Sequence, residues 1–482
     1  MYSPISIKRF SMLFSSMVFV WIFLPIVFFG NFILQKLFSK RFGNRPANTW
    51  LLLGSLFFYA WGEPIYVFLM LASITLNWLS GLVLVKVPFK KTVVFVSVAL
   101  NLALLGYFKY AGMLVSTVNA LMHREFTVPE ISLPIGISFF TFQALSYVID
   151  VYRGEAEVQK NWFKLALYVS FFPQLIAGPI VKYKDVNDQI DNRTISLTQT
   201  AAGIRRFIYG FSKKVLIANV MGLCADTLYG MNIGEMTGLM VWIASISYTL
   251  QIYFDFSGYS DMAIGLGKMF GFEFKENFNY PYRSHSIREF WRRWHISLSS
   301  WFRDYVYIPL GGNRKGQVRT YINLFIVFFL TGIWHGASWT FVFWGIYHGI
   351  FCIIERLGLE KLLKKSKILS WIYTIFVVNI GWVFFRVDSI KAGFSYVRMM
   401  LMPWKYTASP VAIQEMVTNK MFAMIVLGIL GSGIVKWIGE KTKLDEKWRY
   451  SYLEIIFCAL MFLLSICSLA GDTYNPFIYF RF

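Results

Sequence analysis

Two histidines lie beside apolar runs, where a titratable side chain is costly to keep. The chain has 482 residues and only five histidines. His335 stands between two apolar stretches, and His295 stands in a stretch rich in tryptophan and arginine. Because imidazole titrates near neutral pH, both side chains indicate proton transfer. The alternative interpretations are a hydrogen-bonded core histidine for His335 and an interfacial histidine for His295.

Several other polar side chains in the same regions are candidates to bind a substrate. Arg292 and Arg293 form a guanidinium pair that suits an anionic cofactor such as the phosphates of coenzyme A, or alternatively lipid phosphates. Asp255 lies among aromatic residues, where its carboxylate could orient an imidazole or a sugar hydroxyl, or join a structural ion pair. His348 lies on a returning helix, where it either reaches the same cavity or packs in the core.

The composition indicates that a lipid bilayer surrounds these residues. Hydrophobic residues make up 56% of the chain and charged residues 15%, whereas a soluble domain carries about 25% charged residues. The net charge is +21, and the basic residues gather in short loops, as the positive-inside rule expects. We therefore predict membrane lipid as a partner, because basic loops attract anionic headgroups, and no nucleic acid.

The apolar runs predict an all-α polytopic membrane protein that forms a single transmembrane domain over residues 1–482. A spanning helix needs about 20 apolar residues, so we expect roughly 11–13 membrane helices and re-entrant segments. Residues 287–302 predict one amphipathic helix with a tryptophan-rich face. The expected spans are 13–34, 92–115, 133–151, 162–180, 204–229, 238–256, 371–386, 421–436 and 451–470, with hairpins at 49–85 and 320–355.

Several classes of site are absent from the sequence. No nucleophile elbow, H-E-x-x-H motif or phosphate-binding loop occurs. The four cysteines form no CxxC pair, and no closely spaced ligand set predicts a metal. A membrane transporter remains an alternative from another class, although no paired repeat of broken helices is visible.

The motif region 253–349 closely resembles the membrane-bound O-acyltransferase superfamily. Within it, the similarity is to the bacterial branch of the alginate O-acetylation protein and the peptidoglycan O-acetyltransferases. The matching stretches are Tyr253–Asp261, Asn279–Arg283, Glu289–Gly312, Gly332–Ser338, Phe58–Gly62, Leu133–Gly154, Phe171–Ile180 and the tail Asn475–Phe482.

This resemblance implies helices around a central funnel or tunnel, in the cytoplasmic (inner) membrane of a bacterium. His335 matches the essential histidine of the family and His295 its second active-site position, with Trp334 and Ser338 as further substrate contacts. The implied acyl donor is acetyl-CoA from the cytoplasm, with an acyl carrier protein as the less favoured donor. The implied acceptor is an extracytoplasmic polysaccharide such as alginate or peptidoglycan, often reached through a partner acetyltransferase. Transfer to a lipid or a protein is the alternative within the superfamily.

The tail 475–482 is short and strongly aromatic, with two interpretations. Its aromatic residues are Phe477, Tyr479, Phe480 and Phe482. Such residues form anchors at membrane interfaces. Alternatively, the tail reaches back to His335, and the Tyr479 hydroxyl carries the acetyl group as a covalent relay.

Overall fold

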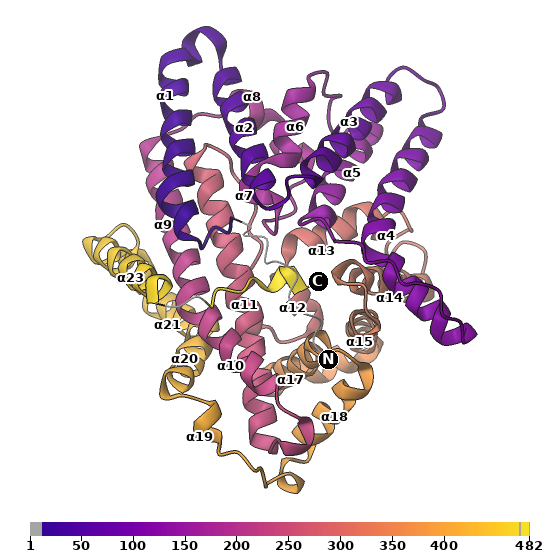
Figure 1. The fold of residues 1–482 in the computed structure, drawn as a ribbon, viewed down its shortest axis with the longest axis vertical. Coiled ribbons are helices and arrows are strands. Elements are labelled where there is room, and N and C mark those ends of the chain that lie inside the picture. Colours follow the sequence, from indigo (N-terminus) through magenta and orange to yellow (C-terminus); the bar gives the residue numbers. More distant parts are fainter. Residues whose placement is uncertain (1–11, 472–473, 482) are drawn as a thin grey trace. The chain divides into compact units, whose positions relative to one another are not determined.

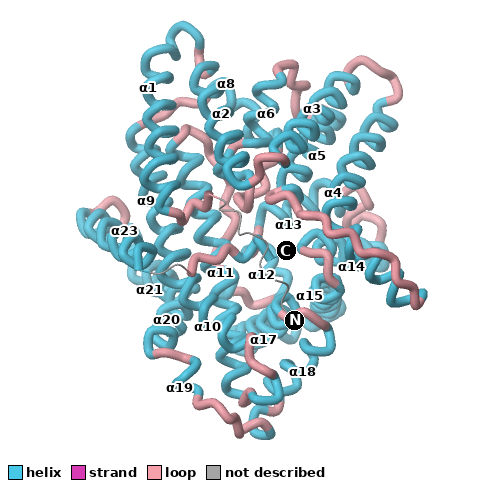
Figure 2. The backbone as a smooth tube through the Cα atoms, in the orientation of Figure 1, coloured by secondary structure: helices cyan, strands magenta, loops and turns pink. Residues whose placement is uncertain are grey.

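The protein is helical throughout the part of the chain that the structure describes. A computed structural model describes residues 12–471 and 474–481, and it contains no strand within them (Figures 1 and 2). In these residues, 10 helices are long and apolar enough to cross a membrane. The prediction of an all-α polytopic membrane protein is thus confirmed. Phe482, at the end of the predicted tail, lies outside the described residues.

The chain divides into two compact units, and the first consists of residues 1–207 and 262–275. Its polypeptide crosses back and forth in antiparallel helices, as the purple part of Figure 1 shows. The helices are α1 (Leu24–Phe42), α2 (Arg45–Gly62), α3 (Tyr66–Leu84), α4 (Lys90–Met122), α5 (Ile137–Arg153), α6 (Trp162–Ser170), α7 (Phe172–Leu175), α8 (Tyr183–Asn192) and the first part of α9 (Leu197–Ser212).

The second unit consists of residues 208–261 and 276–482. It contains all the residues predicted for the site, so the site can be described within one unit. Its helices are η2 (Lys213–Ala218), α10 (Asn219–Tyr229), most of α11 (Gly238–Met269), α12 (Ile287–Arg293), α13 (Ile296–Phe302), α14 (Gln317–His335), α15 (Trp339–Ile354), α16 (Glu360–Leu363), α17 (Lys367–Arg386), α18 (Ile390–Leu401), α19 (Ile413–Met416), α20 (Asn419–Ile429), α21 (Val435–Thr442), α22 (Leu444–Trp448), α23 (Tyr452–Gly471) and the terminal turn η9 (Ile478–Arg481).

The predicted span 162–180 is wrong, because the chain does not form one helix there. Helix α6 has 9 residues and is therefore about 13 Å long, whereas the hydrocarbon core is about 30 Å thick. Pro173 stands in the first turn of the short α7, and irregular chain follows. A proline lacks the amide hydrogen that a continuous helix would need.

Helices α14 and α15 form the predicted hairpin and place His335 at its turn. Two glycines let the helix backbones touch. A Cβ atom on Gly332 would lie 2.5 Å from the Phe341 carbonyl oxygen, and one on Gly345 would lie 2.4 Å from that of Phe328. Because no side chain fits, only glycine permits this close packing. His335 is the last residue of α14, held against the start of α15.

The amphipathic helix predicted for residues 287–302 is broken in two. Helix α12 ends at Arg293 and α13 begins at Ile296. His295 lies between them with φ 44°, in the left-handed region that non-glycine residues rarely adopt. The sequence offered no proline or glycine to signal this break, so the helical spacing of its aromatic residues was misleading.

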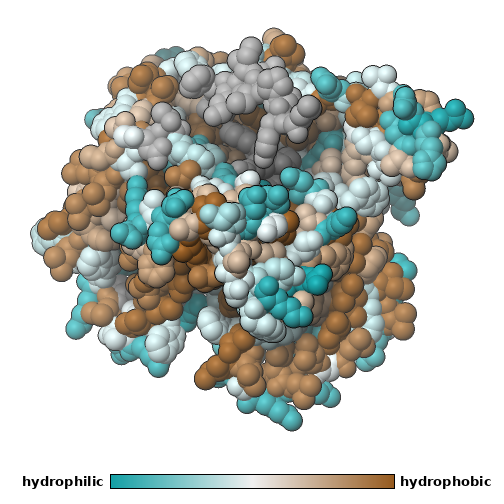
Figure 3. Space-filling model, turned by 60° about the horizontal axis from the view of Figure 1, so that its bottom comes forward, coloured by the Kyte–Doolittle hydropathy of each residue, from teal (hydrophilic) through white to brown (hydrophobic). Residues whose placement is uncertain are grey.

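The protein surface carries the apolar side chains that a bilayer requires. Figure 3 shows broad apolar areas in brown on the displayed face, with hydrophilic residues in smaller groups. Exposed examples on spanning helices are Ile26, Phe95, Phe422 and Ile456. Because lipid solvates such side chains, their exposure fits a membrane protein.

Candidate active site

His295 is fully buried and is held through its Nδ1 atom. The loop before α12 runs beside the break between α12 and α13, since Ile296 N–H donates to the Asn277 carbonyl at 2.9 Å. This backbone contact brings the Asn277 side chain to the imidazole, where Oδ1 lies 3.2 Å from His295 Nδ1. Ser297 Oγ lies 3.4 Å from the same nitrogen. The unusual backbone of His295 is thus stabilised by a polar network on one side of its ring.

These contacts fix which nitrogen of His295 carries the proton. The backbone N–H of Ser297 donates to Asn277 Oδ1 at 3.1 Å, and Ser297 Oγ donates to it at 2.9 Å. The atom of Asn277 that faces His295 is therefore an oxygen, which can only accept a hydrogen bond. Nδ1 must then be protonated, and Nε2 keeps its lone pair. Burial also lowers the pKa of His295, which keeps the ring neutral.

The lone pair of His295 Nε2 points at the hydroxyl of Tyr479. The two atoms are 3.3 Å apart, and the Tyr479 ring packs against Phe256 at a centroid distance of 4.7 Å. Burial raises the pKa of the Tyr479 hydroxyl, so it holds its proton at rest. A neutral phenol facing an imidazole lone pair is the arrangement of a nucleophile and its general base.

Tyr479 and His335 line one small cavity, whose wall is mostly aromatic and aliphatic. The His335 ring lies 5.0 Å from the rings of Trp334 and Trp344. The lining residues are Ile252, Phe256, Trp294, His335, Trp382, Phe385, Ile478 and Tyr479. The structure therefore brings His335, His295 and Tyr479 together, although Tyr479 faces His295 and not His335 as the sequence had suggested.

Two residues in the middle of the tail are buried, and this bears on the two interpretations of its aromatic residues. Phe477 is 3% exposed and Ile478 is 2% exposed. Phe477 stacks on Tyr259 at 4.6 Å between ring centroids. An interfacial anchor would present its rings to lipid headgroups, and Phe477 does not.

Asp255 forms a buried ion pair with Lys214. Asp255 Oδ1 and Lys214 Nζ are 2.8 Å apart, and both side chains are almost completely buried. The other carboxylate oxygen, Oδ2, accepts the backbone N–H of Ile478 at 2.8 Å. Asp255 is therefore directed at the tail, one residue before Tyr479.

Three of the other predicted residues, Ser338, His348 and Arg293, have contacts that indicate structural roles. The Ser338 hydroxyl caps α15 by accepting the Thr340 N–H at 3.3 Å. His348 is fully buried between Trp344, at 5.2 Å, and Trp291, at 5.3 Å, and does not line the cavity. Arg292 is exposed, and Arg293 pairs with Glu289 at 2.9 Å. Trp334 is the exception, because its ring lies 6.0 Å from that of His295 and contacts His335.

Sequence reasoning missed Asn277 and Lys214. Asn277 lies in an irregular stretch without a motif, so its distance to His295 follows only from the loop hydrogen bonds. Lys214 carried a weak signal, since a lysine inside an apolar helical run is costly and calls for a partner. Asp255 faces it from a different helix, and no spacing rule joins the two.

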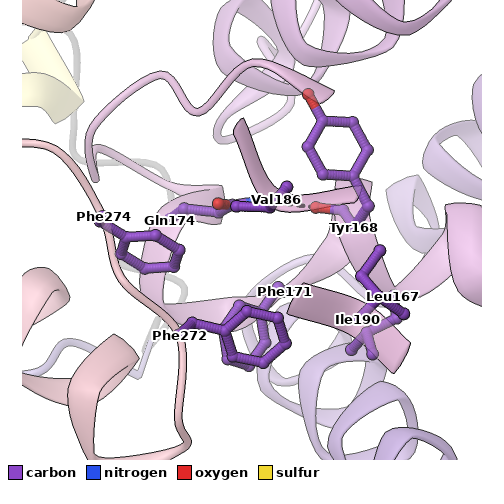
Figure 4. A pocket seen from close by; sticks show the side chains of 8 residues that line it. All are labelled: Leu167, Tyr168, Phe171, Gln174, Val186, Ile190, Phe272 and Phe274. Atoms are coloured by element: carbon purple, nitrogen blue, oxygen red, sulfur yellow. Dashed lines mark hydrogen bonds between the residues drawn. The ribbon is translucent and has the colours of Figure 1, made fainter. Parts of the chain in front are cut away.

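The first unit contains a separate small apolar cavity (Figure 4). Phe171, Phe272 and Phe274 form one side of it. Gln174, shown with them, donates from Nε2 to the Tyr168 carbonyl. None of the predicted site residues lies here, and the described residues contain no group of His, Cys, Asp and Glu that could hold a metal.

The cavity lined by His335 and Tyr479, with His295 behind the Tyr479 hydroxyl, is the candidate site in this helical unit. The sequence pattern of the membrane-bound O-acyltransferase family matches residues 86–387. The chain belongs to this family and is an O-acyltransferase that passes several times through a membrane.

Three relatives show the range of this family. The "Probable alginate O-acetylase AlgI" of Pseudomonas putida is 40% identical over 98% of this chain and 100% of its own. The peptidoglycan O-acetyltransferase of Helicobacter pylori is 37% identical over 83% of this chain and 82% of its own. The teichoic acid D-alanyltransferase of Bacillus subtilis is 32% identical, but over 48% of this chain and 61% of its own.

Proposed function

We propose that this enzyme moves an acetyl group from cytoplasmic acetyl-CoA to an extracytoplasmic polysaccharide, in the cytoplasmic membrane of a bacterium. The names of two similar proteins, an alginate O-acetylase and a peptidoglycan O-acetyltransferase, support acetate as the group and a polysaccharide as the acceptor. The acceptor receives the acetyl group from this enzyme or through a partner acetyltransferase. The contact between Tyr479 Oη and His295 Nε2 at 3.3 Å carries the mechanistic part of the proposal.

In the first step, the Tyr479 hydroxyl attacks the thioester carbonyl of the donor. His295 Nε2 takes the phenolic proton as the new oxygen–carbon bond forms. The carbon–sulfur bond then breaks, and the leaving thiolate takes up that proton. The products are O-acetyl-Tyr479 and free coenzyme A, and His295 returns to its starting tautomer.

In the second step, a hydroxyl of the acceptor attacks the acetyl group on Tyr479. His335 lines the same cavity and takes the proton of this hydroxyl. The bond between the acetyl carbon and the phenolic oxygen breaks, and Tyr479 recovers its proton. Each turnover thus transfers one acetyl group and restores both histidines and the tyrosine.

A second cavity, beside the start of α14, supports a donor site. This open cavity has a volume of about 410 Å³, and both Arg288 and Arg356 line it. Arg288 also pairs with Glu360 at 2.6 Å. Two guanidinium groups suit the phosphates of coenzyme A. Arg356→Gln is expected to raise the KM for acetyl-CoA about 10-fold with kcat unchanged, as a charged hydrogen bond predicts. An unchanged KM would move the donor site elsewhere.

Substitution of Tyr479 by phenylalanine tests the relay directly. Tyr479→Phe keeps the ring against Phe256 and removes only the hydroxyl, so the protein should stay folded. If Tyr479 carries the acetyl group, acetate on the surface polysaccharide falls to background in cells that produce this variant. Radiolabel from acetyl-CoA should also appear on wild-type Tyr479 in the absence of acceptor. Normal acetylation by Tyr479→Phe would refute the relay and leave direct transfer assisted by His335.

A further inference from the structure

The stretch before Tyr479 is held by polar contacts that reach its backbone. Lys214 Nζ donates to the Pro476 carbonyl, and Asp255 accepts the Ile478 N–H. Lys214 Nζ also donates to Asn219 Oδ1 at 2.8 Å. Asn219 in turn donates to Asn475 Oδ1 at 3.2 Å. Because the contacts to Pro476 and Ile478 are made to main-chain atoms, they fix the path of the tail backbone independently of the side chains there.

The buried ion pair needs hydrogen bonds from the tail to satisfy its remaining polar atoms. Lys214 and Asp255 are 2% and 1% exposed, and they lie in helices long and apolar enough to cross a membrane. Burying two charges costs more than their attraction returns unless further hydrogen bonds complete the set. The Pro476 carbonyl and the Ile478 N–H are two of the groups that complete it. An apolar pair of similar size would pack as well, but it would not bind a backbone.

We propose that Lys214 and Asp255, the tail-binding pair, are positioning residues that hold the tail so that the Tyr479 hydroxyl lies at His295. Asp255 fixes the N–H of Ile478, the first residue of η9. Tyr479 follows immediately, so its ring packs on Phe256 and its hydroxyl reaches the imidazole. This inference rests on the proposed role of Tyr479, and it assigns Asp255 to the tail and not to the substrate.

Hydrogen exchange of the full-length protein in detergent measures whether the tail is held. In Lys214→Met with Asp255→Leu, the two charges are replaced together, so neither is left unpaired. The C-terminal peptide should exchange about 10- to 100-fold faster, as expected when charged hydrogen bonds are lost. In acetyl transfer, kcat should fall about 100-fold because the nucleophile is misplaced, with the KM for acetyl-CoA unchanged.

The neighbouring ion pair provides a matched control. Lys213 and Asp261 come from the same two elements and are 2.6 Å apart. Lys213→Met with Asp261→Leu should leave the exchange of the tail and the kcat at wild-type values. If both double variants slow transfer equally, the effect is one of general stability and the proposal is wrong.

A substitution on the tail gives a second test that leaves the helices untouched. Ile478→Pro removes the N–H that Asp255 accepts, at the first position of a helical turn, where proline is tolerated. Ile478→Ala keeps the N–H and serves as the reference for the loss of the buried side chain. A further loss of kcat and of protection in Ile478→Pro relative to Ile478→Ala supports the tail-binding pair, whereas equal behaviour of the two contradicts it.

The same measurements separate this inference from the relay. If Tyr479→Phe is inactive while the paired variant has a fast-exchanging tail and full activity, the tail-binding pair is refuted and the relay stands. If Tyr479→Phe is fully active, the relay is refuted, and the positioning role is refuted with it. The exchange of the tail then still reports whether the pair binds it.

Discussion

The tautomer of His295 can be tested by changing Asn277, the residue that dictates it. Asn277 Oδ1 accepts from Ser297 N, Ser297 Oγ and His295 Nδ1, at 3.1, 2.9 and 3.2 Å. Asn277→Leu removes the acceptor and leaves these buried donors unpaired. At about 1–3 kcal/mol for each unpaired buried group, with the Ser297 hydroxyl free to rotate elsewhere, folding stability should fall by about 2–6 kcal/mol.

We expect Asn277→Leu to lower the activity by a larger factor than it lowers the amount of folded protein. Without the acceptor, His295 is free to carry its proton on Nε2, which then cannot accept from Tyr479. Loss of general-base catalysis corresponds to a decrease in kcat of about 100- to 10,000-fold. The assay is acetyl transfer from radiolabelled acetyl-CoA per mole of folded protein, with thermal unfolding measured on the same samples.

Asn277→Asp is the conservative counterpart. Asn277 Nδ2 makes no hydrogen bond to the described residues, so replacing it with an oxygen breaks no bond. The carboxylate still accepts from His295 Nδ1, and kcat near pH 8 should stay within about 10-fold of wild type. A negative charge beside the imidazole raises the pKa of His295. As the pH is lowered, the variant should therefore become protonated at His295, and lose activity, at a higher pH than wild type does. Equal activity of the leucine and aspartate variants, or an unshifted pH profile, would refute the role of Asn277.

Three further outcomes follow from the geometry. His335→Ala should abolish acetylation while the protein remains in the membrane; normal polysaccharide acetate in cells that produce it would remove His335 from the mechanism. Gly345→Ala places a Cβ atom 2.4 Å from a backbone oxygen and should lower stability by about 1–3 kcal/mol, as thermal unfolding in detergent can measure. In wild type, the lowered pKa of His295 keeps Nε2 unprotonated as pH falls, so the rate of Tyr479 acetylation in the first step should show no inflection near 6.5, the ordinary histidine pKa. Because the unfolded chain binds that proton first, the contribution of His295 to folding stability should decline as pH falls below about 6.5.

The long helices and the hairpin that carries His335 could be predicted from the sequence. Apolar runs of spanning length predict membrane helices reliably, because a bilayer requires every backbone polar group to be paired within the segment. The position of His335 followed from the same logic, since the chain turns at the glycine after it. The hairpin 320–355 was therefore correctly predicted.

The contacts within the site could not be predicted from the sequence. The break at His295 depends on a left-handed backbone that loop hydrogen bonds stabilise, and the local residues do not encode it. Tyr479 was expected to meet His335, yet it lies at His295 because a buried ion pair on distant helices holds the tail. Periodicity describes one helix at a time, whereas these contacts join segments far apart along the chain.

The apolar wall of the cavity around Tyr479 has a consequence for side reactions. Acyl esters of a phenol and thioesters are both activated toward hydrolysis, so a wet site would release acetate without transferring it. Ile252, Phe256, Trp382 and Phe385 form much of the cavity wall. A water molecule needs two to four polar partners to reside in such a space. In the proposed relay, an acetyl group on Tyr479 would therefore meet carbon on most sides, which favours its transfer to an acceptor hydroxyl over its loss to water.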